Sequence, residues 1–264
     1  MSYLFRTGPL EIAVPAPIEV FLWATPNSWK ITIALEEMEL PYVSRPVAIG
    51  KREQFKPDFL AVSPNNRVPA IVDPEGPGGT PISVFESGAI LHYLGRKTGR
   101  FFPKDERGRV EVEQWLFWQM AGVGPMFGQA SHFRNYAPNL VDDPVKIEYS
   151  TKRYDNEVNR LLGVLDRRLA DRTFVAGDYS IADMALYPWV AYARGLGQDM
   201  SAFARVETWL DRITTRPAVQ RGMAVGADLQ GPPPARGSKE QREFATALFG
   251  QTAATVAAVS SRQG

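Results

Sequence analysis

The spacing of apolar residues in the first hundred positions switches repeatedly between a strand period and a helix period. An apolar run over 18–23 predicts a strand, and apolar residues at helical spacing over 29–39 predict a helix after a short turn. Three more strands and two more helices follow: strands over 42–49, 68–73 and 82–86, and helices over 53–60 and 87–98. The predicted order is βαβαββα within residues 18–101.

From residue 104 onward the strand period disappears and only helical spacing remains. The predicted helices are those over 107–119 with a continuation, 144–169, 181–195 and 201–215. Arg216-Pro217 is expected to end the last of them, because the residue before a proline disfavours helical backbone angles. The sequence therefore predicts an α/β domain over 18–101 and an all-helical domain over 106–225.

The two ends of the chain follow neither period. Residues 1–17 contain three prolines and a glycine and are expected to form an N-terminal arm. Residues 226–264 are expected to form a tail in which EQREFATALFG predicts a short helix. The opening has no apolar run typical of a secretory signal, and no stretch reaches the roughly 18 apolar residues of a membrane span. We expect a cytoplasmic protein without a membrane partner.

Composition narrows the chemistry. With 30 basic and 29 acidic residues the net charge is +1, so no overall field favours nucleic acid. The chain has no cysteine, which excludes disulfides, thiolate metal sites and a cysteine nucleophile, and redox chemistry would need a thiol from another molecule. The two histidines, His92 and His132, are too few and too widely spaced for zinc, so no metal is expected.

Two short motifs at strand ends each allow a structural and a functional interpretation. In the segment from Asn65 to Ala70, Pro69 opens a strand, which suits a strand edge; a cis Val68–Pro69 bond would instead turn the Val68 main chain outward to pair with a peptide-like ligand. Ser87 stands where a strand becomes a helix and is expected to cap it, with Glu86 beside the positive helix end. The same groups would also bind a carboxylate and an ammonium group.

A third motif is structural. Ser180-Ile181-Ala182-Asp183 has the spacing of a capping box, in which Ser180 caps the helix and Asp183 reaches back to the cap. No chemistry is assigned to it.

Taken together, SPNNRVPAIVD and SVFESGAILHYL resemble the glutathione site of glutathione transferases. The resemblance extends through TPNSWKITIALEE, QWLFWQMAGVGPMFGQ, YDNEVNRLLGVLDRRL and FVAGDYSIADMALYPWV, and covers about residues 18–222. Among the subclasses the chain most resembles the bacterial nu class, which is similar to the yeast nitrogen-regulator-like transferases. The resemblance implies a thioredoxin-like N-terminal domain, an all-helical C-terminal domain, a homodimer and glutathione as cosubstrate.

The resemblance also implies site residues. It implies a cis bond at Pro69, main-chain pairing of glutathione at Val68, and γ-glutamyl binding by Glu86 and Ser87. Further glutathione contacts are implied for Gln54 at the glycine end, for Arg67, and for Arg153 from the helical domain. The loop between two long helices supplies candidates for a second-substrate pocket: His132, Phe133 and Tyr136.

The group that activates the glutathione thiol should follow the first strand, and it must lower a thiol pKa of roughly 8.5. From the residues alone, Thr25 begins a turn, Pro26 sets it and Asn27 caps the helix. Residues 18–30 contain no tyrosine, which argues against the tyrosine-using classes. The nu-class resemblance implies that Thr25 and Asn27 contact the sulfur, and Ser28 is the theta-like rival. Ser28-Trp29 departs from the nu pattern, where glycine and a polar residue are common.

Three functions follow from these observations. The first is glutathione-dependent disulfide oxidoreduction or peroxide reduction, with glutathione or glutathione disulfide and a small disulfide as partners. The second is conjugation, or cleavage of a β-aryl ether, in which the same thiolate attacks a small electrophile. The third is a non-catalytic glutathione-binding interaction module.

Overall fold

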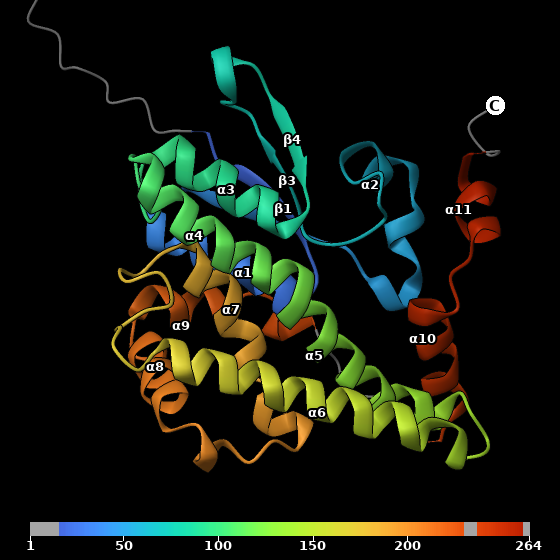
Figure 1. Cartoon of the computed structure of the whole chain (residues 1–264). Helices are drawn as coiled ribbons and strands as arrows, with labels where there is room; N and C mark the ends of the chain where they lie inside the picture. The colour runs from blue at the N-terminus through green and yellow to red at the C-terminus, as the bar shows by residue number, and fades with distance from the viewer. Residues whose placement is uncertain (1–15, 230–236, 261–264) are drawn as a thin grey trace, which may run out of the picture.

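The N-terminal half of the molecule is built around a four-stranded mixed sheet (Figure 1). The structure is a computed structural model and describes residues 16–229 and 237–260. In chain order the strands are β1 (Ile18–Leu22), β2 (Tyr42–Pro46), β3 (Ala70–Asp73) and β4 (Ile82–Phe85). β1 pairs in parallel with β2 and antiparallel with β3, and β3 pairs antiparallel with β4, so the order across the sheet is β2-β1-β3-β4.

The helices of this half are α1 (Pro26–Met38), α2 (Pro57–Val62) and α3 (Ser87–Thr98). The order βαβαββα is as predicted, and the fold is that of a thioredoxin-like domain. α1 begins three residues earlier than the apolar spacing indicated, because Thr25 caps it and Pro26 occupies its first turn. Every residue from Lys30 to Leu35 is buried, since α1 packs against α3 and also against helices of the second half.

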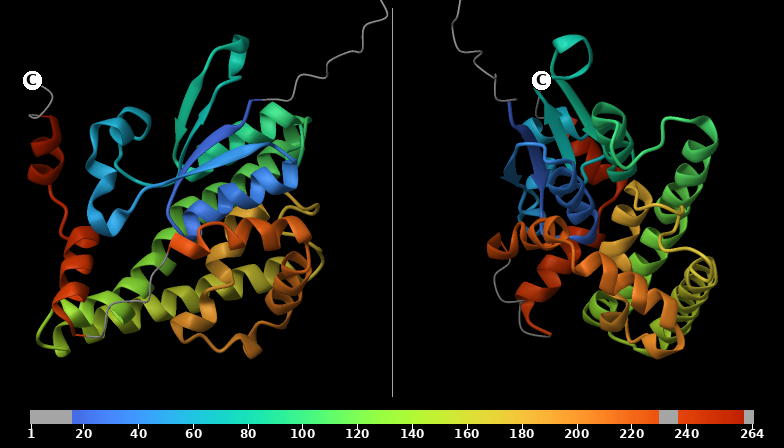
Figure 2. Two further views of the ribbon diagram at one scale, coloured as in Figure 1. Left: turned by 180° about the vertical axis from the view of Figure 1, so that it is seen from behind. Right: turned by 90° about the vertical axis from the view of Figure 1, so that its left-hand side faces the viewer.

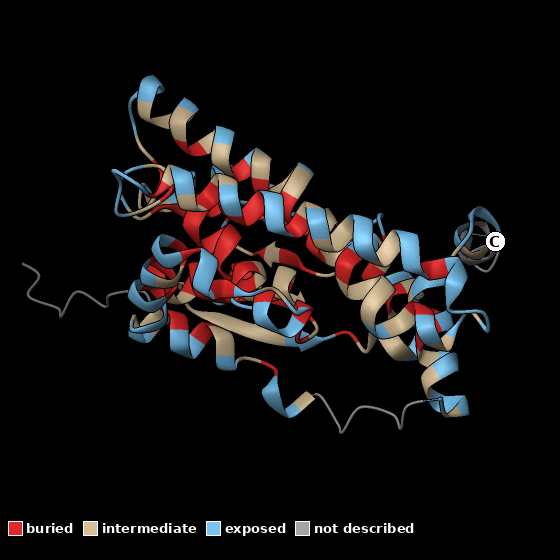
Figure 3. Ribbon diagram, turned by 60° about the horizontal axis from the view of Figure 1, so that its bottom comes forward, coloured by how far each residue is buried: buried red, intermediate tan, exposed pale blue. Residues whose placement is uncertain are grey.

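The described part of the C-terminal half is built from helices, with only isolated β-bridges at Phe174–Gly177 and Ala176–Asp178. Its main helices are α4 (Glu106–Trp118), α5 (Gly124–Ser131), α6 (Val145–Arg168), α7 (Ile181–Val190), α8 (Ala204–Thr214) and α9 (Pro217–Ala224). α4 and α5 are joined by the π-helical turn η4 (Gln119–Val123), so the predicted continuation is real. α6 runs back alongside them (Figure 1), and the buried residues gather where the helices face one another and the sheet (Figure 3).

Helix α9 was not predicted from the sequence. Arg216-Pro217 was expected only to end a helix, but Pro217 also begins the next one, in the first turn where its missing N–H costs nothing. α9 lies directly on α1: Thr32 Oγ1 donates to the Gly222 carbonyl over 2.7 Å. A Cβ atom at Gly222 would come within 2.7 Å of the Ile33 main chain, so this approach requires glycine.

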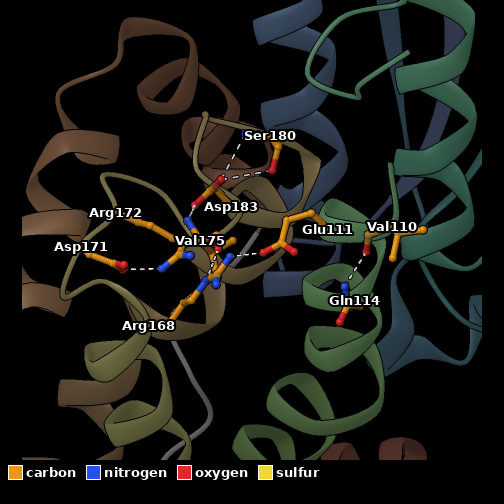
Figure 4. Close-up of polar contacts among 9 residues, drawn as sticks. All are labelled: Val110, Glu111, Gln114, Arg168, Asp171, Arg172, Val175, Ser180 and Asp183. Carbon is orange, nitrogen blue, oxygen red and sulfur yellow. Dashed lines mark hydrogen bonds and ion pairs between the residues drawn. The ribbon is translucent and has the colours of Figure 1, made fainter. Parts of the chain in front are cut away.

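The predicted capping box anchors the start of α7. Asp183 is fully buried and accepts from the main-chain N–H groups of Val175 and Ser180, from the Ser180 hydroxyl and from Trp209 Nε1. Burial raises the pKa of Asp183 to about 6, against the effect of these donors. Nearby, Arg168 donates to the Val175 carbonyl over 2.7 Å and pairs with Glu111 of α4 (Figure 4). The box therefore connects α7 and α8 to the α6–α7 loop.

The tail contains one predicted and one unpredicted helix: α10 (Lys239–Phe249) and α11 (Ala253–Ser260). α10 packs against the 3-10 turn η1 (Ile49–Lys51) of the N-terminal half (Figure 2). The Phe244 ring lies against Gly50 in this contact. Most of the predicted arm, residues 1–15, lies outside the described residues, as do 230–236 and 261–264 of the predicted tail.

Candidate active site

A cavity of about 500 Å³ lies where the two halves of the molecule meet. Its walls come from the β1–α1 turn, the loop before β3, α5 and α7, and the end of α10. Six of the residues singled out from the sequence line it: Thr25, Asn27, Gln54, Arg67, Val68 and Tyr136. The cavity is therefore the candidate active site.

Thr25 and Ser28 lie differently with respect to this cavity. Thr25 Oγ1 accepts the Ser28 main-chain N–H at 3.4 Å and lies 3.2 Å from Ser28 Oγ. Thr25, rather than Asn27, is thus the N-cap of α1. The Ser28 side chain is buried and does not line the cavity, whereas Thr25 does.

The Asn27 side chain is held by the helical half. Its Oδ1 accepts a hydrogen bond from Trp189 Nε1 of α7 at 3.0 Å. Because an indole nitrogen can only donate, the atom that faces it must be the amide oxygen. The Asn27 NH₂ group is therefore left as a donor beside the N-terminus of α1, at the wall that Asn27 and Trp189 share.

The loop before β3 brings main-chain groups to the cavity. The Val68–Pro69 bond is cis, as the resemblance implied. Val68 lines the cavity, and within residues 16–229 and 237–260 its main chain makes no hydrogen bond. Ser63 Oγ donates to the Arg67 carbonyl over 2.8 Å and so fixes the turn.

Glu86 and Ser87 do not line the cavity, and they adopt a different arrangement from the one expected. Glu86 occupies the N-cap position of α3 with φ of 68°, and its side chain accepts from Asn65 Nδ2 at 3.0 Å. Ser87 is the first residue of α3 and is buried, so its hydroxyl does not cap the helix as predicted. Its Oγ instead accepts from Lys30 Nζ at 3.3 Å.

Lys30 was not singled out from the sequence. It is 1% exposed, it also donates to Gln119 Oε1 over 2.7 Å, and burial lowers its pKa to about 7. The signal was present, because a lysine between Trp29 and Ile31 interrupts the apolar run of a buried helix.

Gln54 has an unusual environment for an amide. It is 1% exposed and lines the cavity, yet neither its oxygen nor its nitrogen has a hydrogen-bond partner in the part of the chain that the structure describes. Buried polar groups nearly always have partners, so the unpaired amide at this wall makes Gln54 a candidate for a ligand contact.

The candidates for the second-substrate pocket are divided. Tyr136 lines the cavity, and the His132 ring packs beside it against Phe249 of α10 at 4.4 Å. Burial lowers the pKa of His132, which favours the neutral ring. Phe133 stacks on Tyr154 at 5.4 Å and lines a separate depression. Arg153 is exposed on α6 and does not line the cavity.

Several cavity residues were not identified from sequence. Trp29, Trp189, Tyr192 and Phe249 supply aromatic walls. In the tail, Gln251 Oε1 accepts from Asn66 Nδ2 at 3.1 Å and from Arg67 Nη1 at 3.0 Å, so the segment after α10 is tied to the loop before β3.

Residues 16–229 and 237–260 hold no group of three or more histidine, aspartate or glutamate side chains that could bind a metal ion. None of the helices that the structure describes is long and apolar enough to cross a membrane.

Comparison with known proteins identifies both halves. Residues 24–97 match the family model of the glutathione S-transferase N-terminal domain, and residues 148–212 match that of the C-terminal domain. The disulfide-bond oxidoreductase YfcG of Escherichia coli is 45% identical and covers 78% of this chain and 94% of its own length. The disulfide-bond oxidoreductase YghU of the same organism is 41% identical, covering 79% and 75% respectively.

Solved structures give the same result. A glutathione transferase family member from Pseudomonas fluorescens, with two glutathione molecules bound, is 41% identical with a TM-score of 0.73, covering 81% of this chain and 95% of its own. A glutathione transferase from Pseudomonas putida, with one glutathione disulfide bound per subunit, is 40% identical with a TM-score of 0.74, covering 82% and 94%.

Proposed function

The chain belongs to the glutathione S-transferase family, and we propose that it is a glutathione-dependent disulfide-bond oxidoreductase. The observation that carries this proposal is a cavity lined by polar groups that a ligand can pair with: the Asn27 amide, the unpaired Gln54 amide and the Val68 main chain. The chain itself has no cysteine. The names of YfcG and YghU, and the glutathione disulfide bound to the Pseudomonas putida relative, support the same activity.

In the proposed reaction, bound glutathione supplies the thiol that the chain lacks. Its thiolate attacks one sulfur of the substrate disulfide; a mixed disulfide forms, the substrate S–S bond breaks, and the leaving thiolate takes a proton from water. A second glutathione thiolate then attacks the glutathione sulfur of the mixed disulfide. The second substrate thiol is released and glutathione disulfide forms, so two glutathiones are oxidised for each disulfide reduced.

The protein's part is to stabilise the attacking thiolate. Lowering the thiol pKa from roughly 8.5 to neutrality requires about 1.4 kcal/mol for each pH unit. We assign this role to the Asn27 NH₂ group and the Thr25 hydroxyl at the positive end of α1. The burial of Ser28 beneath Thr25 supports this assignment over Ser28.

The remaining contacts are proposed from the same arrangement. The Val68 main chain, beside Pro69 and Arg67, would pair with the glutathione backbone, and Gln54 would bind its glycine end. Glu86 and Ser87 would take the γ-glutamyl ammonium and carboxylate. Tyr136, with His132 packed behind it, would face the second substrate. Glu86, Ser87, Arg153 and Phe133 do not line the cavity, and their roles are proposed from the family resemblance.

We also propose a nu-class homodimer that acts in the cytoplasm, where glutathione is the main thiol buffer. Phe117 is 66% exposed on α4, and Val110 lies on the same helix about two turns earlier and is 46% exposed. Such apolar side chains on one helix face are typical of a subunit contact.

Conjugation or β-aryl-ether cleavage is a second candidate. Trp29, Trp189 and Phe249 give the cavity aromatic walls that suit an aryl substrate. The same thiolate would attack an electrophilic carbon and displace the leaving group.

One experiment separates these functions: steady-state turnover of hydroxyethyl disulfide and of 1-chloro-2,4-dinitrobenzene by the full chain with glutathione. We expect disulfide reduction to dominate. Thr25→Val and Asn27→Ala should each slow it roughly ten- to a hundredfold, the effect of losing one hydrogen-bond donor to a charged group, and Ser28→Ala should leave it nearly unchanged. Dominant conjugation would favour the second candidate. Glutathione binding without turnover of either substrate would favour a non-catalytic module.

A further inference from the structure

Lys30 lies at a junction of three structural elements. It is on α1, and its ammonium group reaches Ser87 at the start of α3 and Gln119 and Met120 in η4. These contacts measure 3.3 Å to Ser87 Oγ, 2.7 Å to Gln119 Oε1 and 3.4 Å to Met120 Sδ. The side chain is 1% exposed, so the charge is held within the protein, directly behind the residue proposed to bind the γ-glutamyl carboxylate.

We propose that Lys30 is the positioning residue of the γ-glutamyl subsite: its ammonium group turns the Ser87 hydroxyl into a donor toward the ligand carboxylate and supplies the charge that this carboxylate neutralises. The inference rests on the proposed function, because it takes Ser87 and Glu86 as the γ-glutamyl subsite.

The hydrogen-bond direction follows from the donor set. An ammonium group carries three N–H donors and no acceptor, so Ser87 Oγ must accept from Lys30. The Ser87 proton then has to point elsewhere. Its nearest described alternative is Met120 Sδ at 3.5 Å, which is a weak acceptor. A carboxylate at the N-terminus of α3 would be a much stronger acceptor for the same proton.

The charges around Lys30 support the same role. Among the described residues, Glu86 is the charged group that interacts electrostatically with Lys30, and it does not hydrogen-bond to it. The side chains that contact the ammonium group directly, from α3 and η4, are all neutral. Burial without a hydrogen-bonded counterion lowers the pKa of Lys30 to about 7. When a zwitterionic γ-glutamyl group binds, its ammonium engages Glu86 and its carboxylate approaches Ser87. The carboxylate then becomes the nearest negative charge to Lys30 and favours the protonated form.

Ligand binding should therefore take up a proton at Lys30 above neutral pH. The test is calorimetric titration of the full chain with S-methylglutathione, a ligand without an ionisable thiol, between pH 6 and pH 8 in buffers of different ionisation enthalpy. We expect net proton uptake that grows as the pH rises through 7 and vanishes toward pH 6. We also expect affinity to fall over the same range.

Two variants sharpen the measurement. Lys30→Met keeps the length of the side chain without the charge; it should abolish proton uptake and weaken binding about tenfold or more, the effect of a charge-assisted contact. Ser87→Ala should weaken binding by a similar factor, and the double variant should be little worse than either single one, because both remove the same contact. Circular dichroism of each variant checks its fold.

The outcomes are distinct. Wild-type binding without proton uptake overturns the role of Lys30, and this measurement does not depend on any variant folding. Lys30→Met that folds and binds as tightly as wild type overturns it as well, while leaving the proposed function intact. If the wild-type chain binds no S-methylglutathione at all, the proposed function fails and the inference fails with it.

Discussion

Two regions of the molecule bury polar side chains, and they do so in opposite ways. At the start of α7, Asp183 is fully buried and accepts four hydrogen bonds. At the cavity, Gln54 is equally buried, and neither of its amide atoms has a partner among the described residues. A buried polar group with all its hydrogen bonds made stabilises the fold. A buried polar group without partners at a cavity wall costs free energy until a ligand pairs with it.

The polar side chains of the proposed glutathione site also differ from Asp183 in which parts of the chain orient them. Asp183 is fixed by residues of its own helical half, but Asn27 is fixed by Trp189 and Ser87 by Lys30, each across a boundary between elements distant in sequence. Both orienting groups can only donate, so the Asn27 amide oxygen and the Ser87 hydroxyl oxygen must be the atoms that accept from them. The helical half therefore participates in the chemistry of the N-terminal half.

The largest expected effect is the loss of stability when the hydrogen-bonded Asp183 at the start of α7 is replaced. Asp183→Ala would leave the buried N–H groups of Val175, Ser180 and Trp209 without an acceptor, and each such loss costs about 1–3 kcal/mol. We expect the free energy of unfolding to fall by about 3–5 kcal/mol in denaturant titrations. Asp178→Ala, at an exposed position of the same loop, is the matched control and should change it by less than about 0.5 kcal/mol. Equal effects from both would show that Asp183 contributes no more to stability than an exposed side chain.

The next effect concerns the orientation of Asn27. Trp189→Phe removes the indole N–H but keeps an aromatic wall, so the Asn27 amide is free to rotate. We expect kcat/KM for disulfide reduction to fall roughly tenfold and its pH profile to shift upward, because the thiolate is less stabilised. Tyr192→Phe, at another aromatic position of the same wall, is the control and should leave the profile in place. An unshifted profile for Trp189→Phe would remove Trp189 from this role.

Replacing the unpaired amide of Gln54 should change stability and glutathione binding in opposite directions. Gln54→Met preserves volume and removes two unpaired buried polar atoms, so we expect the free energy of unfolding to stay level or rise by about 1 kcal/mol. Glutathione binding should weaken by about 1–2 kcal/mol. Calorimetric titration and denaturant unfolding of one preparation measure both. A loss of stability with unchanged binding would make Gln54 a structural residue like Asp183.

The effect that is smallest near neutral pH is the contribution of Lys30 to stability, because it grows only as the pH rises above 7. Its pKa is about 7 in the folded chain and near 10.5 when unfolded, so between these values the unfolded state binds more protons. The contribution of Lys30 to stability therefore rises with pH over this window, by at most about 1.4 kcal/mol per pH unit. Comparing wild type with Lys30→Met by denaturant unfolding from pH 7 to pH 10 isolates it. Parallel curves for the two proteins would show that Lys30 does not titrate there.

Much of the fold follows from local sequence. The strand and helix order of residues 18–98, the helices of the second half and the capping box were predicted, because apolar period and capping residues act over a few positions. α9 was missed, since Pro217 reads equally well as the end of one helix and the first turn of the next. Its packing on α1 through Gly222 depends on contacts between residues far apart in the chain.

The sequence by itself determined the family, the absence of a cysteine nucleophile and the segments that carry the candidate site. Tertiary structure decided how those residues are used: that Ser28 is buried behind Thr25, that Ser87 faces Lys30 and does not cap α3, and that α10 forms part of the cavity wall. The physical reason is that residue identity fixes which hydrogen bonds a side chain is able to make. Which of them it does make depends on neighbours brought together only by packing, as Trp189 is brought to Asn27 from the other half of the molecule.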